Sequence, residues 1–407
     1  MSATLARDLR TGRSPWMSRP LPAIPFRKLK RDMTADVIVV GAGISGAMVA
    51  DALTDAGLKV IILDRRGPLM GSTPASTALL QYEIDTPLTE LAVRIGLDRA
   101  ERIWRRSKLA LDALRERAAY LGIKADLAVR DTLYLQGDVL DREGLDLEAA
   151  ARRRAGFEVS VLPAGAVQDR YGLARRAAIL GHGNLAADPR RLAAGFLHAA
   201  LGRGAGIYAP VDVASVETGR DGVTAMTEGG PSVTAPHLVF ATGYELPKYV
   251  PRKNHRIAST YCIATAPQPS AIPAELPFVW EASEPYLYLR SDQDGRIICG
   301  GEDEDFVDEE RRDALMREKT GTIQAKLARL MPGIDSNPVY AWCGSFGAST
   351  TGTPSIGAVP KMPGCFAVLG YGGNGITFSM MAAQILRGLI AGNGDTDSDL
   401  FSFRRKF

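Results

Sequence analysis

The chain is poor in the residues from which metal centres and disulfide frameworks are built. It has four cysteines and four histidines among 407 residues. The cysteines (Cys262, Cys299, Cys343 and Cys365) form no CxxC pair, and the histidines show no HxxxH or HExxH spacing. Scattered, unpaired cysteines are typical of a reducing compartment. We therefore expect a cytoplasmic protein without zinc or any other metal site.

The chain also lacks a long apolar run and an excess of one charge. No stretch of 18 apolar residues occurs, so we predict no transmembrane helix, and the N-terminal region has no apolar segment of the kind a secretory signal needs. The 49 basic and 46 acidic residues are interspersed, which argues against a nucleic-acid surface. Only residues 1–34 are locally basic. We expect them to form an extended, solvated arm over the folded body, with a membrane or partner contact as the alternative.

A strand, a glycine-rich turn, a helix and a second strand follow one another between Ala35 and Asp64. The strands are the apolar runs ADVIVV and KVIIL, and the turn is GAGISG. Gly41 permits the tight turn, Gly43 lets the backbone approach a pyrophosphate, and Gly46 lets the helix pack against the strand. Asp64 ends the second strand, where a carboxylate can bind ribose hydroxyls. The pattern predicts a Rossmann-type dinucleotide site at the helix N-terminus.

A second glycine-rich turn near the other end of the chain bears on which dinucleotide is bound. The apolar run CFAVLG leads into YGGNGIT and an apolar helix that ends near Ile390. In flavin enzymes a second helix N-terminus often faces the isoalloxazine ring and stabilises the negative charge that develops there. We therefore interpret the two turns together as a site for FAD rather than NAD.

These motifs resemble the D-amino-acid oxidase, glycine oxidase and sarcosine oxidase family of flavoproteins. The similar stretches span residues 36–390 and are DVIVVGAGISGAMVADALTDAGLKVIILDR, GSTPASTALLQ, HLVFATG, WCGSFGASTTGTPSIG and LGYGGNGITFSMMAAQI. The resemblance implies bound FAD and a mixed α/β fold, in which a Rossmann-like FAD-binding domain carries a second, substrate-binding domain built on an antiparallel sheet.

The expected domain division is discontinuous in sequence. After the arm (1–34), residues 35–125, 181–245 and 340–400 are predicted to form the FAD-binding domain. Residues 126–180 and 246–339 are predicted to form the substrate-binding domain. Within the first of these segments, residues 86–121 show apolar positions at helical spacing and predict one or two long amphipathic helices.

The motifs and the resemblance together give a set of expected cofactor contacts. They lie in the first glycine turn, at the adenosine end, in the loop after Gly71 and in the second glycine turn. The residues are Gly41, Gly43, Ile44, Ser45, Gly46, Asp64, Arg65, Arg66, Ser72, Thr73, Ser76, Thr77, Leu79, Leu80, Gln81, Val213, Ala241, Thr242, Gly243, Gly344, Gly370, Gly372, Gly373, Asn374, Gly375, Ile376 and Thr377. Among them, Val213 is implied to hold adenine through its backbone.

The chain departs from the family pattern where a substrate carboxylate would be bound. Two positions at which glycine-oxidase-like proteins carry basic residues are Phe346 and Gly373 here. Because a bidentate arginine is the natural ligand of a carboxylate, an ordinary α-amino acid is a doubtful substrate. Glu83 and Asp85 could instead hold a cationic amine, although both could equally cap a helix. Arg290 could supply a clamp from another direction or form a surface ion pair.

Further pocket candidates are four tyrosines on or near strands: Tyr244, Tyr261, Tyr286 and Tyr288. The lysine that promotes oxygen reactivity in sarcosine-oxidase-like members aligns here with Ile298, which favours a dehydrogenase. Cys343 lies near the segment where some members attach flavin covalently but is out of register, so we expect non-covalent FAD.

We predict FAD-dependent oxidation of a C–N bond in a small amine or amino acid, with oxygen or another compound as electron acceptor. The alternatives are oxidation of a hydroxy acid on the same fold and a flavin-binding subunit of a heteromeric dehydrogenase, with the arm as its interface.

Overall fold

A parallel sheet forms one half of the molecule in the computed structural model, which describes residues 2–220, 222–252 and 254–405. Its order is β19-β20-β13-β3-β4-β9, with only β19 antiparallel to its neighbour. The strands are β3 (Val37–Val40), β4 (Val60–Leu63), β9 (Gly206–Tyr208), β13 (His237–Phe240), β19 (Ser355–Ala358) and β20 (Cys365–Leu369). Continuous apolar runs form such strands because both faces of a parallel sheet are covered.

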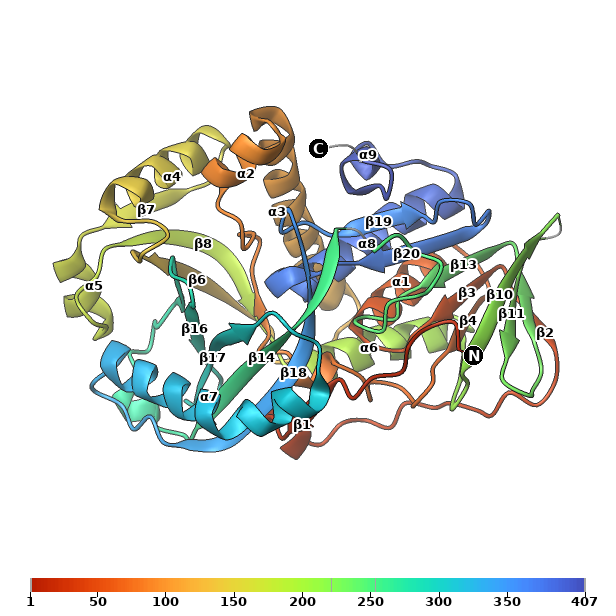
Figure 1. Ribbon diagram of the computed structural model, residues 1–407, viewed down its shortest axis with the longest axis horizontal. Helices are drawn as coiled ribbons and strands as arrows, with labels where there is room; N and C mark the ends of the chain where they lie inside the picture. Colours follow the sequence, from red (N-terminus) through yellow and green to blue (C-terminus); the bar gives the residue numbers. More distant parts are fainter. Residues whose placement is uncertain (1, 221, 253, 406–407) are drawn as a thin grey trace.

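Helices and a small sheet cover this parallel sheet. The helix α1 (Ile44–Asp55) packs against both α6 (Pro189–Gly202) and α8 (Gly375–Ala391). The long helix α3 (Leu97–Tyr120) packs against α8. The small sheet pairs β10 (Val213–Gly219), β11 (Gly222–Thr227), β12 (Val233–Ala235) and β2 (Met33–Thr34), and it lies at the right edge of Figure 1.

A ten-stranded, mostly antiparallel sheet forms the other half (Figure 1). Its main path runs β1-β18-β14-β17-β16-β15-β6-β8-β5, and β7 pairs with β8. The strands are β1 (Arg10–Gly12), β5 (Leu79–Leu80), β6 (Ala128–Leu135), β7 (Val159–Leu162), β8 (Ala178–Ala186), β14 (His255–Thr265), β15 (Phe278–Glu281), β16 (Leu287–Ser291), β17 (Ile297–Glu304) and β18 (Pro338–Ser349). The helix α7 (Glu309–Leu330) packs against β14, β17 and β18.

The strands of the large sheet do not follow the predicted segment boundaries. Most of β8 and of β18 lies in segments assigned to the FAD-binding domain, yet both strands pair within this sheet. A strand's partner depends on long-range topology, which periodicity along the chain does not reveal. The division into two domains stays a prediction.

The remaining helices are α2 (Leu88–Ile95), α4 (Arg142–Arg154), α5 (Ala164–Tyr171) and α9 (Ser398–Phe401). The predicted helical stretch 86–121 is therefore two helices, separated at Gly96, whose φ of 90° ends α2. Among the described residues, no helix is both long and apolar enough to cross a bilayer, and no cluster of three potential metal-binding side chains occurs.

The N-terminal arm contains a short 3-10 helix at Pro15–Ser18, and it is not solvated throughout. Its residues Ala3 and Trp16 are each 1% exposed, and Leu9 is 6% exposed. The strand β1 adds to the edge of the large sheet beside β18, and β2 pairs with β12 of the small sheet. Backbone pairing and apolar burial thus hold this basic segment against the folded body.

The N-terminus of α7 provides a test of local stability. The Asp308 carboxylate accepts a hydrogen bond from Arg311 N at 2.9 Å, as an N-cap residue does. We expect Asp308→Ala to lower the free energy of unfolding by about 1 kcal/mol, measured by urea denaturation, and Asp308→Asn to cost far less. Equal losses in the two variants would attribute the stabilisation to the negative charge at the helix N-terminus instead of the cap.

Candidate active site

Two cavities join to form one elongated cleft between the two halves of the molecule. The first encloses about 1210 Å³ including its mouth, and the second about 750 Å³. They share Ile44, Ser45, Ser72, Thr73 and Gly243. The second cavity lies where β3 and β4 end, the edge at which open α/β sheets bind ligands.

The first glycine turn is fixed by close approaches of its backbone. Gly41 has a φ of 113°, and a Cβ there would lie 2.4 Å from the Ala241 carbonyl oxygen. A Cβ at Gly46 would lie 1.9 Å from the Gly41 oxygen, so α1 can pack here only with glycine. The helix α1 begins at Ile44 without a capping side chain, and Ile44 N donates to Thr73 Oγ1 at 3.1 Å.

The second cavity is lined by charged residues at the end of β4. Asp64 Oδ2 accepts from Ala42 N at 2.7 Å, and its other oxygen accepts from Arg66 N and Gly67 N. The carboxylate therefore braces the turn as well as facing the cavity. Glu245, buried at 6% exposure, lines the same cavity and binds the guanidinium of Arg66 at 2.6 Å.

The wall of the first cavity is aromatic and acidic. Its six aromatic side chains come from loops and strands of both halves: Tyr244, Trp280, Tyr286, Tyr288, Phe346 and Tyr371. Its two ionisable carboxyls are Asp85 and Asp303. Among the residues that the structure describes, no arginine, lysine or histidine lines this cavity. The cavity therefore offers negative charge and π-electron faces, both of which attract cations.

Asp303 is an unusual carboxyl group. Burial raises its pKa to about 6, and hydrogen bonds from Tyr286 and Thr260 oppose that shift. The Tyr286 hydroxyl donates to Asp303 Oδ2 at 2.5 Å. Burial also raises the pKa of Asp85, although Gly373 N donates to its Oδ2 at 2.7 Å and favours the ionised form. Burial likewise raises the pKa of Tyr244 to about 12, so this phenol stays protonated at neutral pH.

Most of the predicted cofactor contacts lie on the surface of the cleft. Those that line the first cavity are Ile44, Ser45, Ser72, Thr73, Ser76, Thr77, Leu79, Gln81, Gly243, Gly344, Gly372, Gly373, Gly375 and Ile376. Those that line only the second are Gly41, Gly43, Asp64, Arg65, Arg66, Val213, Ala241 and Thr242. The structure thus brings together residues that are more than 300 positions apart in the sequence.

Five predicted contacts lie behind the surface of the cleft. Gly46 packs α1 onto the turn, Leu80 is 1% exposed in the core, and a Cβ at Gly370 would meet the His255 ring. Asn374 Nδ2 and Thr377 Oγ1 both donate to the Gln81 carbonyl oxygen, at 3.1 and 2.8 Å. The last two position the segment that contains Gln81 instead of facing a ligand.

Arg290 is not a substrate clamp. Its Nε donates to the Thr77 oxygen at 2.7 Å and its Nη2 to the Ala187 oxygen at 2.8 Å. The guanidinium also stacks over Trp16, 5.0 Å from the ring centroid, and it lies outside the lining of both cavities. Strand periodicity could not show that this side chain would turn toward backbone carbonyls.

Glu83 also points away from the cleft. Its Oε1 accepts from Thr132 Oγ1 at 2.6 Å and from Asn184 Nδ2 at 3.2 Å. Burial raises its pKa, while the neighbouring Arg152 lowers it. Of the two carboxyls proposed to hold an amine, only Asp85 faces the first cavity. Tyr261 is likewise buried outside the cavity lining.

The cysteines and the position aligned with the oxygen-activating lysine lie mostly outside the cleft. Ile298 and Cys343 are buried and line neither cavity. Cys262 does line the first cavity. Burial raises the pKa of its thiol to about 12, so at neutral pH it carries no nucleophilic thiolate.

Three important lining residues were not predicted: Asp303, Trp280 and Glu245. Asp303 belongs to the acidic run EDEDF, which has the appearance of a solvated segment. Only the pairing of β17 with β14 and β16 shows which of its carboxyls faces inward. Glu245 follows the predicted Gly243 turn by two residues, a proximity that could have drawn attention to it.

Residues 36–389 match the DAO family model, described as FAD dependent oxidoreductase. The chain belongs to this family. Its cofactor is therefore FAD, and the protein is an FAD-dependent oxidoreductase. The expected family resemblance and α/β fold are confirmed.

Similar proteins cover nearly the whole chain of this DAO-family member. Gamma-glutamylputrescine oxidoreductase from Escherichia coli is 23% identical over 91% of this chain and 87% of its own. Glycine oxidase from Geobacillus kaustophilus superposes with a TM-score of 0.72 and 22% identity, over 92% of this chain and 100% of its own. L-proline dehydrogenase from P. horikoshii superposes with a TM-score of 0.74 and 16% identity, over 93% and 98%.

The residues of the cleft fit FAD. A Cβ at Gly43 would lie 3.2 Å from Thr73 Oγ1, so the glycine keeps space free at the uncapped N-terminus of α1, where a pyrophosphate can bind amide groups. Gln81 Nε2 is buried and has no hydrogen-bond partner among the described residues. Since buried polar groups are almost always paired, this amide beside the first cavity suits a ligand with acceptor atoms, such as the flavin ring.

Proposed function

We propose that this DAO-family enzyme oxidises a C–N bond in a small amine that carries no carboxylate on the reacting carbon. One observation carries the proposal: the wall of the first cavity has two carboxyls and six aromatic rings, and no basic side chain among the described residues. An amino-acid carboxylate would be left unpaired beside Asp85 and Asp303, at a cost of several kcal/mol (about 2–5). A cationic amine would be attracted to the same wall.

The cofactor is proposed to lie along the joined cavities. The amides at the start of α1, with Ser72 and Thr73, would hold the pyrophosphate. Asp64 and Val213 would contact the adenosine part, and Gln81 with the Gly372–Ile376 turn would contact the flavin ring. The attachment is proposed to be non-covalent, because Cys343 lies outside the cleft and the thiol of Cys262 stays protonated. We place the enzyme in the cytoplasm, since its four cysteines are all free and buried.

When bound, FAD supplies the acceptor for a hydride from the carbon next to nitrogen, and the imine that results hydrolyses in water. The protein has two tasks. Asp85 and Asp303 attract the amine, which is a cation in solution with a pKa of roughly 10. The aromatic wall excludes water and lowers the pKa of the bound amine, because burial disfavours its charged form. The two carboxylates favour the charged form of the amine and oppose this shift, so burial must outweigh them to give the neutral nitrogen that the hydride transfer requires.

The names of similar proteins support an amino compound as substrate, since they include gamma-glutamylputrescine oxidoreductase, glycine oxidase and L-proline dehydrogenase. The electron acceptor is proposed to be oxygen or another small oxidant. No basic residue of the described chain lines the first cavity, and Ile298 is buried in the core; both observations favour a poor reaction with oxygen.

An anaerobic titration tests the proposal. The purified yellow protein is mixed with alkylamines, diamines, glycine, sarcosine, D-alanine and glycolate, and the visible absorption band of oxidised flavin is followed. We expect simple amines to bleach the band and the α-amino acids to leave it unchanged. Rapid bleaching by glycine, sarcosine or D-alanine, with no response to any amine, would overturn the proposal that the substrate lacks a carboxylate on the reacting carbon. Readmitting air then separates an oxidase from a dehydrogenase.

Two other outcomes would replace the proposal with a different function. Bleaching by glycolate alone would identify a hydroxy-acid oxidoreductase on the same fold. No bleaching by any compound, with FAD bound, would identify a subunit that needs a partner chain for turnover.

A further inference from the structure

We propose that residues 2–16 of the N-terminal arm form part of the FAD site and control release of the cofactor. These residues precede the region matched by the family model, which begins at residue 36. The proposal concerns the cofactor, which the family establishes, and it does not depend on which substrate is oxidised. Four sets of contacts support it.

The first set places the start of the arm on the wall of the second cavity. Ala3, Thr4 and Leu9 line that cavity together with the residues predicted for the adenosine end. Ala3 N donates to the Val213 oxygen at 2.8 Å, and Lys248 N donates to the Ala3 oxygen at 3.0 Å. The arm therefore lies over the adenosine end as a backbone-paired cover.

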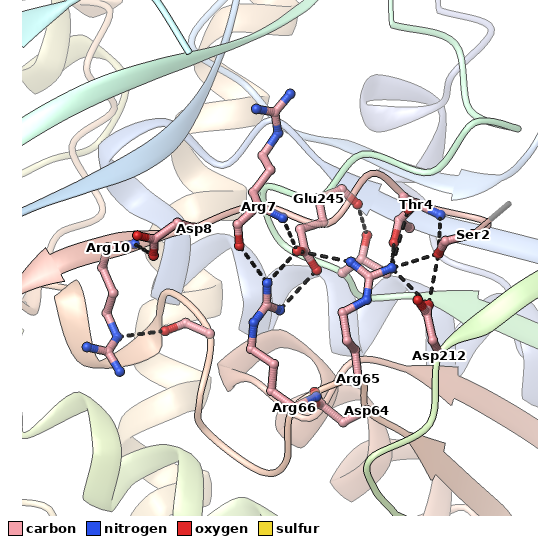
Figure 2. Close-up of polar contacts among 12 residues, drawn as sticks. Ser2, Thr4, Arg7, Asp8, Arg10, Asp64, Arg65, Arg66, Asp212 and Glu245 are labelled. Atoms are coloured by element: carbon pink, nitrogen blue, oxygen red, sulfur yellow. Dashed lines mark hydrogen bonds and ion pairs between the residues drawn. The ribbon is translucent and has the colours of Figure 1, made fainter. Parts of the chain in front are cut away.

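The second set is a polar cluster that closes one side of this cover (Figure 2). Arg65 Nη2 donates to Ser2 Oγ at 2.7 Å, to Thr4 Oγ1 at 2.9 Å and to Asp212 Oδ1 at 2.8 Å. Ser2 Oγ also donates to Asp212 Oδ1 at 2.8 Å. Arg65 and Asp212 both line the second cavity, so the arm and the cofactor site share these side chains.

The third set joins the arm to Glu245. Arg7 N donates to Glu245 Oε1 at 2.8 Å, and Arg66 Nη2 donates to the Arg7 oxygen at 2.7 Å. Arg66 pairs with the same carboxylate, and Figure 2 shows the three groups meeting beside the arm. Because Glu245 is buried, removal of the arm would deprive its Oε1 of the hydrogen bond from Arg7 N, and a buried acceptor that loses a partner is destabilising.

The fourth set holds the loop that follows Gly71, where pyrophosphate and flavin contacts are predicted. Ser14 Oγ donates to the Pro74 oxygen at 2.6 Å, and Trp16 Nε1 donates to the Ser76 oxygen at 2.8 Å. Arg10 Nε donates to the Gly71 oxygen at 3.3 Å. The arm thus contacts both ends of the predicted cofactor position, and FAD can leave by the adenosine end only after the arm has detached.

Removal of residues 2–8 tests this role while keeping β1 and Trp16. Cofactor loss is followed by the rise in free-flavin fluorescence after dilution into a scavenger of FAD. We expect the shortened chain to release FAD at least about tenfold faster. In the full-length chain the arm must first detach, which breaks several hydrogen bonds between the arm and the protein body, worth about 1 kcal/mol each. The matched control is Lys28→Ala with Lys30→Ala, which removes exposed positive charge elsewhere in the arm and should leave the rate unchanged.

A second measurement uses the full-length chain and guards against misfolding of the shortened one. If docking of the arm strengthens FAD binding, then bound FAD must strengthen docking of the arm by the same coupling free energy. We expect trypsin to cleave after Arg7 or Arg10 at least about fivefold faster in the apoprotein than in the FAD-loaded protein. Equal cleavage rates, or an unchanged rate of FAD release from a folded shortened chain, would overturn the proposal.

Discussion

Replacement of Gly46 by alanine is expected to give a protein that is purified without colour. The added Cβ would lie 1.9 Å from the Gly41 carbonyl oxygen and 2.9 Å from its carbonyl carbon. Both are backbone atoms, so α1 must move away from the glycine turn. That movement withdraws the amides at the helix N-terminus from the pyrophosphate. Loss of two charge-assisted hydrogen bonds, at about 1.5 kcal/mol each, weakens FAD binding by about 100-fold.

Two further variants separate cofactor binding from folding. Gly43→Ala places its Cβ 3.2 Å from Thr73 Oγ1, a side-chain atom that can shift. It should therefore fold normally and still bind FAD more weakly, because the methyl group occupies the space beside the phosphates. Gly321→Ala in α7 is the control, since its Cβ meets no atom within 4 Å. Fluorescence titration of the apoproteins measures the dissociation constants, and normal FAD affinity in Gly46→Ala would contradict the predicted placement of the cofactor.

Replacement of Asp303 by asparagine is expected to lower kcat/KM for an amine substrate by about ten- to a hundredfold at pH 8. The estimate follows from the loss of one hydrogen bond between charged groups, worth about 1.5–3 kcal/mol. Because the pKa of Asp303 is about 6, the wild-type carboxyl becomes negative as pH rises through that value. KM for a cationic amine should therefore fall between about pH 5 and 7 in the wild type, and Asp303→Asn should not show this step.

The stability of the same variant gives an independent check. Burial raises the pKa of Asp303 in the folded protein to about 6, above the value of about 3.9 for an unfolded chain. The wild type therefore loses stability as pH rises through this interval, whereas the asparagine variant does not. We expect Asp303→Asn to be the more stable protein at pH 8, so its lost activity cannot come from unfolding.

Asp305→Asn, at an exposed ion pair with Arg256, is the matched control. If Asp303→Asn showed the same KM values as the wild type between about pH 5 and 7, the role of Asp303 in binding the cationic amine would be contradicted.

The glycine turn could be predicted from sequence because its requirements are local. A tight turn, a close backbone approach and a packed helix each demand glycine at a fixed spacing, and the structure places Gly41 and Gly46 in these positions. The parallel strands were also recognisable, since burial on both faces leaves continuous apolar runs such as VIVV.

Side-chain direction in the large sheet could not be predicted in the same way. Glu83 and Arg290 were candidates because of their place in the sequence, yet the first binds Thr132 and the second binds backbone oxygens. Asp303 was overlooked within an acidic run. Which of these groups faces a cavity depends on strand register and on partners 17 to 213 residues away, and neither is encoded in local periodicity.

The loop after Gly71 is held by its main chain, and this has a consequence for how the enzyme can change. The indole of Trp342 donates to the Ala75 oxygen at 2.9 Å, and Arg290 donates to the Thr77 oxygen, as arm residues do for other carbonyls of the loop. A carbonyl oxygen is present whatever the side chain. Ala75 faces the first cavity and is not among the expected cofactor contacts, so evolution or a designer can vary it to reshape the pocket while the loop backbone keeps its place. A change of pocket shape at this position therefore leaves the predicted cofactor contacts of Thr77 and Leu79 unaltered.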